Sequence, residues 1–139
     1  MGLWDKLVDR FKSLDWQGIE EKDNEPRWPY RNFTRDEVAC KCCGGLVEEP
    51  AALERLDQLR VELPGVRINC GYRCPVHNAR VGGAPLSQHK LGSAFDISTR
   101  GRYSREDVVK AAKSVGFTGF GLYNTFVHVD MAKRTFKGK

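Results

Sequence analysis

The sequence contains no long hydrophobic run and few histidines. No stretch among its 139 residues reaches the roughly 18 consecutive apolar side chains of a membrane-spanning helix, so none is predicted. The first residues also lack a basic segment followed by an apolar run and a small-residue cleavage site. We therefore expect synthesis in the cytoplasm without a signal peptide. With only three histidines in the chain, the position of each one is informative.

Acidic charge is scarce in most of the chain. Residues 1–27 hold five basic and seven acidic side chains, whereas residues 28–139 hold eighteen basic and eleven acidic ones. A basic body suits an anionic partner such as nucleic acid, a membrane surface or a cell-wall polymer, although an ordinary solvated surface gives the same count. The length and the apolar fraction of 40% predict one compact domain, which we expect to be a monomer.

The N-terminal segment differs in pattern from the rest. Its apolar residues recur at the spacing of one helix face: Leu3, Leu7, Val8, Phe11 and Leu14. A charged arm with two prolines, "GIEEKDNEPRWPYRN", follows this amphipathic helix. We therefore divide the chain into a helix with a connecting arm over 1–31 and a domain over 32–139. The helix either packs on the domain or docks on a membrane or a protein partner.

The domain mixes helices and strands without a regular repeat. Two helix starts carry a capping box, Thr34 with Glu37 and Ser104 with Asp107, and a third helix is predicted over 50–63. Strands are predicted over 66–72, over 93–99 and on both sides of Asn124, with a long loop over 73–92. Strands and crossover helices do not alternate, so the pattern predicts an α+β fold with a central, mostly antiparallel sheet flanked by helices.

Two short segments of the sequence each contain a histidine and an aspartate. His89 ends the Gly-rich loop, and Asp96 lies in the strand that follows it. In "FVHVDM", the residues Phe126, His128 and Asp130 share one strand face, while the alternate residues are apolar. Two histidines and an aspartate from separate strands are a ligand set typical of zinc with one position open to water. Taken singly, each histidine is also explained as a hydrogen-bonded core or loop residue.

A family resemblance rests on these segments. "SQHKLGSAFD" resembles the Ser-x-His-x6-Asp motif of the D-alanyl-D-alanine carboxypeptidase-like zinc peptidases, whose fold is shared with the hedgehog signalling domain. "GYRCPVHNARVGGAPLSQH" and "FGLYNTFVHVDM" are similar to segments of its small cell-wall and phage members. The resemblance covers roughly residues 32–131. It implies a hedgehog/DD-peptidase-like fold and hydrolysis of amide bonds in peptidoglycan stem peptides or cross-links.

The resemblance also assigns roles to single residues. It implies that Zn²⁺ is bound by His89, Asp96 and His128. Arg73 matches an arginine that binds the substrate carboxylate or carbonyl, and a structural ion pair is the alternative. Ser87 matches a serine that hydrogen-bonds the substrate peptide, unless it caps the loop. His77 is expected to bind substrate by stabilising an oxyanion, or else to hydrogen-bond within the loop.

One position departs from the pattern of many relatives. They carry a carboxylate three residues before the last histidine ligand as the general base, and this chain has Thr125 there. Asp130 shares a strand face with His128 and lies about 7 Å further along. We predict Asp130 as the catalytic base or as a support for a metal ligand. Its replacing His128 as the third ligand is the remaining alternative.

Five cysteines are not explained by these motifs: Cys40, Cys42, Cys43, Cys70 and Cys74. "CKCC" and "CGYRC" could form a second zinc site of four thiolates, although their spacings differ from the paired two-residue gaps of zinc ribbons. A single disulfide or free thiols account for the same residues.

Two classes of function follow from the sequence. One is a zinc metallopeptidase, and the other is a non-hydrolytic zinc-containing module that binds the cell wall or a protein. The missing carboxylate at Thr125 favours the second class. A cysteine–zinc nucleic-acid binder leaves the histidine motifs unexplained, so nucleic acid is not expected as a partner. The resemblance to phage lysins implies an endolysin or virion-associated enzyme that acts at the bacterial wall after release.

Overall fold

The structure is a computed structural model that describes residues 28–137. The predicted N-terminal amphipathic helix lies outside these residues. The helices are α3 (Arg35–Val38), α4 (Pro50–Glu62), α5 (Pro75–Arg80) and α6 (Arg105–Val115), with a 3₁₀ turn η1 (Gln88–Leu91). The strands are β1 (Ile68–Cys70), β2 (Phe95–Ser98), β3 (Gly119–Leu122), β4 (Phe126–Asp130) and β5 (Thr135–Lys137). None of the helices in this part of the chain is long and apolar enough to cross a membrane.

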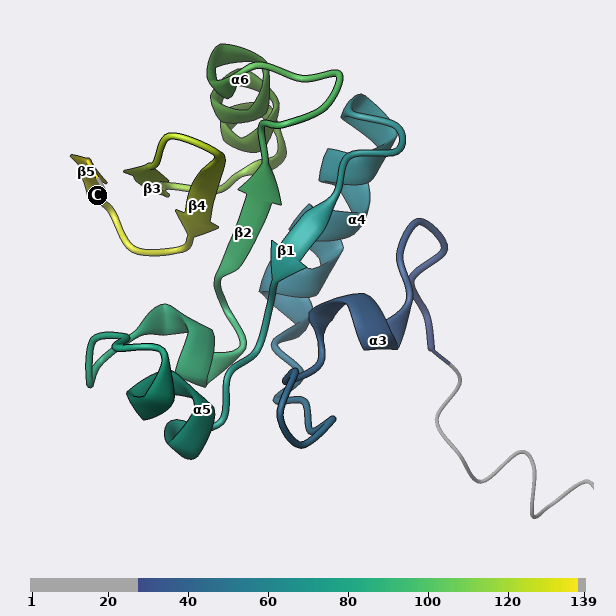
Figure 1. Ribbon diagram of the computed structural model, residues 1–139. Coiled ribbons are helices and arrows are strands. Elements are labelled where there is room, and N and C mark those ends of the chain that lie inside the picture. Colours follow the sequence, from purple (N-terminus) through teal and green to yellow (C-terminus); the bar gives the residue numbers. More distant parts are fainter. Residues whose placement is uncertain (1–27, 138–139) are drawn as a thin grey trace, which may run out of the picture.

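The five strands form one sheet in the order β1-β2-β4-β3-β5. The pairs β1–β2, β2–β4 and β3–β4 are antiparallel, and β3–β5 is parallel. This arrangement confirms the predicted α+β class and the mostly antiparallel sheet. Figure 1 shows α5 beyond one end of β1 and β2, so the chain passes from β1 through α5 and η1 before it returns as β2.

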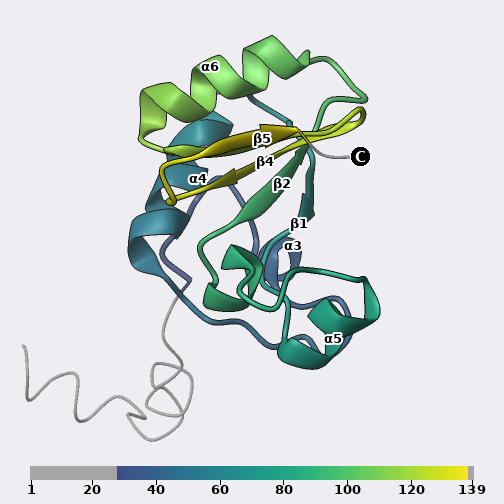
Figure 2. The ribbon, with the colours of Figure 1, turned by 90° about the vertical axis from the view of Figure 1, so that its left-hand side faces the viewer.

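The hydrophobic core lies between the sheet and the helices α4 and α6. Phe95 and Ile97 of β2 and Val127 and Val129 of β4 are buried in it, because alternate residues of a strand point to the same face. Leucines of α4 and small apolar residues of α6 belong to the same cluster, and Figure 2 shows the two helices next to each other beside the sheet. The opposite face of β2 and β4 is therefore left for polar side chains.

Both predicted capping boxes are present. The Thr34 N–H donates to Glu37 Oε2 at 2.7 Å, and the Ser104 N–H donates to Asp107 Oδ2 at 2.9 Å. These contacts satisfy backbone donors that a helix start leaves without an intrahelical partner. The predicted helix over 50–63 and the strands on both sides of Asn124 are also confirmed.

The structure differs from the predictions in two segments. The interval 73–92, predicted as a loop, contains α5 and η1, because Pro75 opens a helical turn after the extended Cys74. The second difference is β5, a three-residue strand that pairs with β3. Such a short strand has too few residues to show a period in the sequence. The boundary predicted between residues 31 and 32 stays a prediction, although Trp28 and Tyr30 pack against the core.

Candidate metal centre

The polar residues of the site lie in one row across the sheet. Asp96 of β2 is paired with His128 of β4, which is paired with Gly121 of β3. Cys70 of β1 pairs with Asp96 on one side, and Phe136 of β5 pairs with Gly121 on the other. Because directly paired residues point to the same face, the antiparallel register places the Asp96 and His128 side chains together.

Three side-chain atoms converge at this row. His89 Nε2 lies 3.1 Å from Asp96 Oδ1 and 3.1 Å from His128 Nδ1, and the latter two atoms are 3.2 Å apart. Nitrogen and oxygen ligands at tetrahedral angles around one zinc, at bond lengths of ~2.1 Å, would lie about 3.4 Å apart. Two imidazoles and one carboxylate also match the chemistry of zinc sites that keep a fourth position open. The three residues, which we call the histidine centre, therefore fit a zinc ion.

The outer nitrogen of each imidazole is bonded to an acceptor. His89 Nδ1 lies 2.7 Å from the Gly71 carbonyl oxygen, which can only accept, so Nδ1 carries the proton. His128 Nε2 lies 2.7 Å from Asp130 Oδ2 and is in the same way the donor. The remaining nitrogens, Nε2 of His89 and Nδ1 of His128, are then lone-pair donors that face Asp96. Such outer contacts orient metal-binding histidines and select their tautomer.

The charges in the site support one another. Burial raises the pKa of Asp96, but its close contacts with His128 and His89 outweigh this effect and bring the pKa well below its usual value. Burial likewise raises the pKa of Asp130, and the contacts with His128 and the Ala132 N–H lower it below the usual value. Burial lowers the pKa of His128, whereas its bonds to Asp130 and Asp96 raise it above the usual value. Both carboxylates are therefore ionised at neutral pH.

Asp130 lies behind His128 and is completely buried. Besides His128, it accepts hydrogen bonds from the Ala132 N–H at 2.9 Å and from Arg134 Nη2 at 3.2 Å. Gly119 faces the carboxylate on the neighbouring strand, and a Cβ at that position would overlap it. Asp130 thus contacts the ring nitrogen opposite the one that faces Asp96. These contacts are those of a residue that orients His128.

A tight turn presents His89 to the sheet. The Ser87 hydroxyl accepts a hydrogen bond from the His89 N–H at 3.2 Å and caps η1. Gly92 ends the turn with φ = 71°, in the left-handed region that favours glycine, and a Cβ there would collide with the Val47 carbonyl. The capping role that the sequence left open for Ser87 is therefore present. Its predicted contact with substrate stays a prediction.

A cleft of about 840 Å³ opens over the histidine centre. Its walls include the predicted substrate-binding residues Arg73, His77 and Ser87 together with all three residues of the centre. The other charged side chains of the lining are Lys41 and Arg134. Among the described residues that line the cleft, Asp96 is the only carboxylate, so the cleft is basic around the candidate metal position.

Arg73 is available to a ligand. Its guanidinium makes one long contact, from Nη1 to Asn78 Oδ1 at 3.4 Å, and its buried Nε has no hydrogen-bond partner in residues 28–137. No carboxylate in that range lies within ion-pair distance of it. A buried donor without a partner costs free energy, so the position suits an arginine that is completed by an anionic or carbonyl oxygen.

Aromatic residues and one arginine of the site were not predicted. Tyr123 and Phe126 line the cleft as a stacked pair with ring centroids 4.2 Å apart. Phe136 lies over the gap left by Gly121, 5.7 Å from the His128 ring, and Arg134 lies over Phe136 at 4.8 Å. The sequence pattern places Phe126 on the same strand face as His128, and this pattern could have predicted Phe126 as a residue of the site. Phe136 and Arg134 reach the site only through β5.

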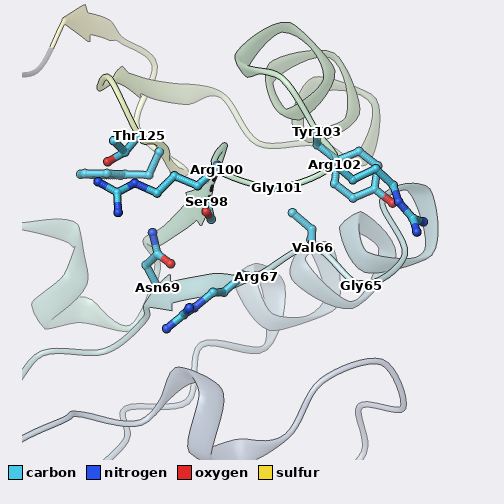
Figure 3. Close-up of a pocket in the computed structure, with 11 residues that line it drawn as sticks. Gly65, Val66, Arg67, Asn69, Ser98, Arg100, Gly101, Arg102, Tyr103 and Thr125 are labelled. Carbon is cyan, nitrogen blue, oxygen red and sulfur yellow. Dashed lines mark hydrogen bonds between the residues drawn. The ribbon is translucent and has the colours of Figure 1, made fainter.

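A second, arginine-rich pocket of about 620 Å³ adjoins the cleft and shares Asn69 and Phe126 with it. Arg67, Arg100 and Arg102 line this pocket, and Figure 3 shows the Arg100 side chain reaching toward Thr125. In the described part of the chain no acidic side chain lines it. The basic surface therefore continues from the cleft along the sheet.

The comparison with known families agrees with this site. A model described as Peptidase M15 matches residues 31–130, which contain the whole histidine centre and the cleft residues Arg73, His77 and Ser87. This family consists of zinc-dependent peptidases of the D-Ala-D-Ala carboxypeptidase-like type. No curated protein shows a significant match to the chain. Since the match extends over most of the chain, the protein belongs to the peptidase M15 family.

Proposed function

We propose that the protein is a zinc-dependent peptidase that hydrolyses amide bonds in peptidoglycan stem peptides or in their cross-links. The observation that carries the proposal is the convergence of His89 Nε2, Asp96 Oδ1 and His128 Nδ1 within 3.2 Å of one another at the floor of a basic cleft. Membership of the peptidase M15 family supports the same reaction. The net charge of +5 suits an anionic wall polymer.

The residues of the centre would bind the metal, and groups next to them orient the two histidine rings. His89, Asp96 and His128 would hold the metal, and the Gly71 carbonyl and Asp130 keep both rings in the required tautomer. Zinc in such a centre polarises a carbonyl group and activates water for attack on it. Asp130 contacts only the outer nitrogen of His128 there, so we assign it to positioning in preference to the general-base role that the sequence also allowed.

Substrate binding falls to the wall of the cleft. Arg73 would bind a carboxylate or carbonyl oxygen of the peptide, and the Ser87 hydroxyl can still donate a hydrogen bond while it accepts one from the His89 N–H. His77 and Tyr123 are cleft residues that can exchange a proton with the substrate. The arginine-rich pocket would accept an anionic part of the polymer further from the bond that is cut.

Digestion of purified peptidoglycan tests this proposal. The zinc-loaded protein would be incubated with walls of several chemistries, and the fragments would be identified by mass spectrometry. Loss of one terminal amino acid from stem peptides would show a carboxypeptidase, and conversion of cross-linked dimers to monomers would show an endopeptidase. The chelated protein and the His89→Ala variant are the controls. Intact peptidoglycan in every reaction would contradict the proposal.

The second candidate is a binding module that contains zinc but does not hydrolyse. It is favoured by one observation, which is that Asp96 is the only carboxylate among the described residues lining the cleft. Thr125, at the position where many relatives carry the base, lines the adjoining pocket. Sedimentation with insoluble peptidoglycan distinguishes the two functions. A chain that binds walls of several chemistries and releases no fragment is the binding module.

We also propose the hedgehog/DD-peptidase-like fold and an endolysin-like or virion-associated role, in which the protein acts at the bacterial wall after its release. The fold is supported by a mostly antiparallel sheet whose strands β2 and β4 carry Asp96 and His128, and by the family match over residues 31–130. The role is tested by adding the protein to intact and to permeabilised bacteria, and by expressing it inside them. Lysis only when the protein can reach the wall is the expected result, and lysis during cytoplasmic expression without permeabilisation would contradict it.

A further inference from the structure

Four of the five cysteines gather at the edge of the cleft, away from the histidine centre. Cys40, Cys42 and Cys43 lie in the turn after α3, and Cys74 lies directly before α5. Their four sulfur atoms lie within 4.8 Å of one another. We call these four residues the cysteine cluster. The fifth residue, Cys70, is separate, because its sulfur lies 3.9 Å from His89 Nδ1 and groups with His89 and Asp96.

The sulfur positions match those of ligands around one metal ion. Cys42 Sγ lies 3.4 Å from Cys74 Sγ and 3.7 Å from Cys40 Sγ. Four thiolates around a tetrahedral zinc, at bond lengths of ~2.3 Å, lie about 3.8 Å apart. The residues come from two segments more than thirty positions apart in the sequence, so the convergence is produced by the fold and not by local spacing.

Backbone amides point at the sulfurs. The Cys74 N–H donates to Cys40 Sγ, the His77 N–H to Cys74 Sγ and the Gly45 N–H to Cys43 Sγ, each at 3.4 Å. Hydrogen bonds from amides stabilise the negative charge of a thiolate and orient it as a ligand. Three of the four sulfurs thus accept a hydrogen bond from a backbone amide. This environment favours thiolates that bind a metal over neutral thiols.

We propose that the cysteine cluster binds one structural zinc ion through four thiolates. Closed four-ligand sites of this kind stabilise a fold and leave no position for substrate. The ion would join the turn after α3 to the segment that carries Arg73 and α5, and thus the wall of the cleft. The Tyr72 N–H bond to the Val38 carbonyl at 2.8 Å already links these segments, which shows that they are adjacent before any metal is considered.

Metal content measured on the whole reduced chain tests the proposal. Elemental analysis is expected to give two zinc ions per parent chain and one in Cys42→Ser, whose side chain is exposed and therefore least needed for packing. The matched control Cys70→Ser removes a thiol that lies outside the cluster and next to His89, so it should keep the zinc of the cysteine cluster. His89→Ala should keep the cluster's zinc, so its count should fall from two to one. A Cys42→Ser variant with the parent's zinc content would overturn the proposal.

Cobalt substitution tests the proposal on the unmutated chain, so the result does not depend on whether a variant folds. The unmutated chain loaded with Co²⁺ should show the intense near-ultraviolet charge-transfer band of thiolate–cobalt bonds, and His89→Ala should retain it. Absence of this band in the reduced parent would overturn the proposal. Neither measurement involves peptidoglycan, so failure of the proposed enzymatic function would leave the result for the cysteine cluster unchanged.

Discussion

The histidine centre and the cysteine cluster are built in opposite ways. His89 and His128 are 1% and 7% exposed, two of the three proposed ligands lie on paired strands, and each ring has an outer acceptor. Cys42 and Cys43 are exposed in a turn. The Cys42 sulfur contacts those of Cys40 and Cys74, and the Cys43 sulfur accepts from the Gly45 N–H. The sheet and the outer acceptors therefore order the first site without a metal, whereas fewer contacts from outside the cluster hold the sulfurs of the second.

The largest effect is expected at the centre itself. His89→Ala removes one of the three proposed ligands, so the variant should lose one zinc per chain and all hydrolysis of peptidoglycan. Elemental analysis and fragment analysis measure the two losses. His77→Ala is the matched control, since His77 lines the cleft without contacting the ligands and should keep the zinc. If His89→Ala contained as much zinc as the parent, His89 would not be a zinc ligand and the comparison of the two sites would fail.

The support behind His128 is expected to contribute less than a ligand. Asp130→Asn keeps an oxygen for the Ala132 N–H but loses the charge next to His128, so zinc affinity at the centre should fall roughly 10- to 100-fold. Competition with a chromophoric chelator measures it. The exposed Asp36→Asn should bind zinc as the parent does. Unchanged affinity with turnover lowered by about 10² to 10⁴ would instead identify Asp130 as the general base.

Arg73 lies between the two sites, since its N–H donates to the His89 carbonyl and the next residue is Cys74. Arg73→Ala should keep both zinc ions and lower kcat/KM roughly 10- to 100-fold, the value of a hydrogen bond to a charged group. Steady-state kinetics on a stem-peptide substrate measure this loss. Arg80→Ala, an exposed arginine of α5, is the control. Lost zinc in Arg73→Ala would show that the residue supports the sites and not the substrate.

Acid should weaken the centre in a defined direction. The bonds to Asp130 and Asp96 raise the pKa of His128 above its usual value, and zinc binds only the neutral imidazole. Zinc affinity should therefore be complete above that raised pKa and should fall about tenfold per unit of pH below it. In Asp130→Asn the decline should begin at a lower pH. Chelator competition at several pH values measures both curves, and coincident curves would contradict this account.

The smallest effect is expected in the scaffold, far from both sites. Ser104→Ala removes the cap of α6 and should lower the free energy of unfolding by about 1 kcal/mol. The zinc count should remain at the parent's value because α6 packs on the core face of β4, opposite the face that carries His128. Urea unfolding measures the change, and Ser114→Ala in the last turn of the same helix is the control. A loss of zinc in Ser104→Ala would mean that the sites depend on the whole core.

The sequence predicted those elements whose signals are local. The capping boxes at Thr34 and Ser104 and the alternation in "FVHVDM" depend on neighbouring residues alone, and the structure contains all three. The family resemblance supplied the set His89, Asp96 and His128, and the structure brings these side chains together. The strand β5 was missed because its three residues are stabilised by pairing with β3 and not by any pattern of their own.

Other features depend on contacts between distant segments. The sequence placed Asp130 about 7 Å along the strand from His128, but side-chain reach brings its carboxylate to 2.7 Å from the ring. Likewise, the chain by itself determined that five cysteines exist and where the histidines stand. Only the tertiary structure decided that four of the cysteines meet and that Cys70 does not. The physical reason is that pairing and packing bring together residues far apart in the sequence, which local periodicity cannot register.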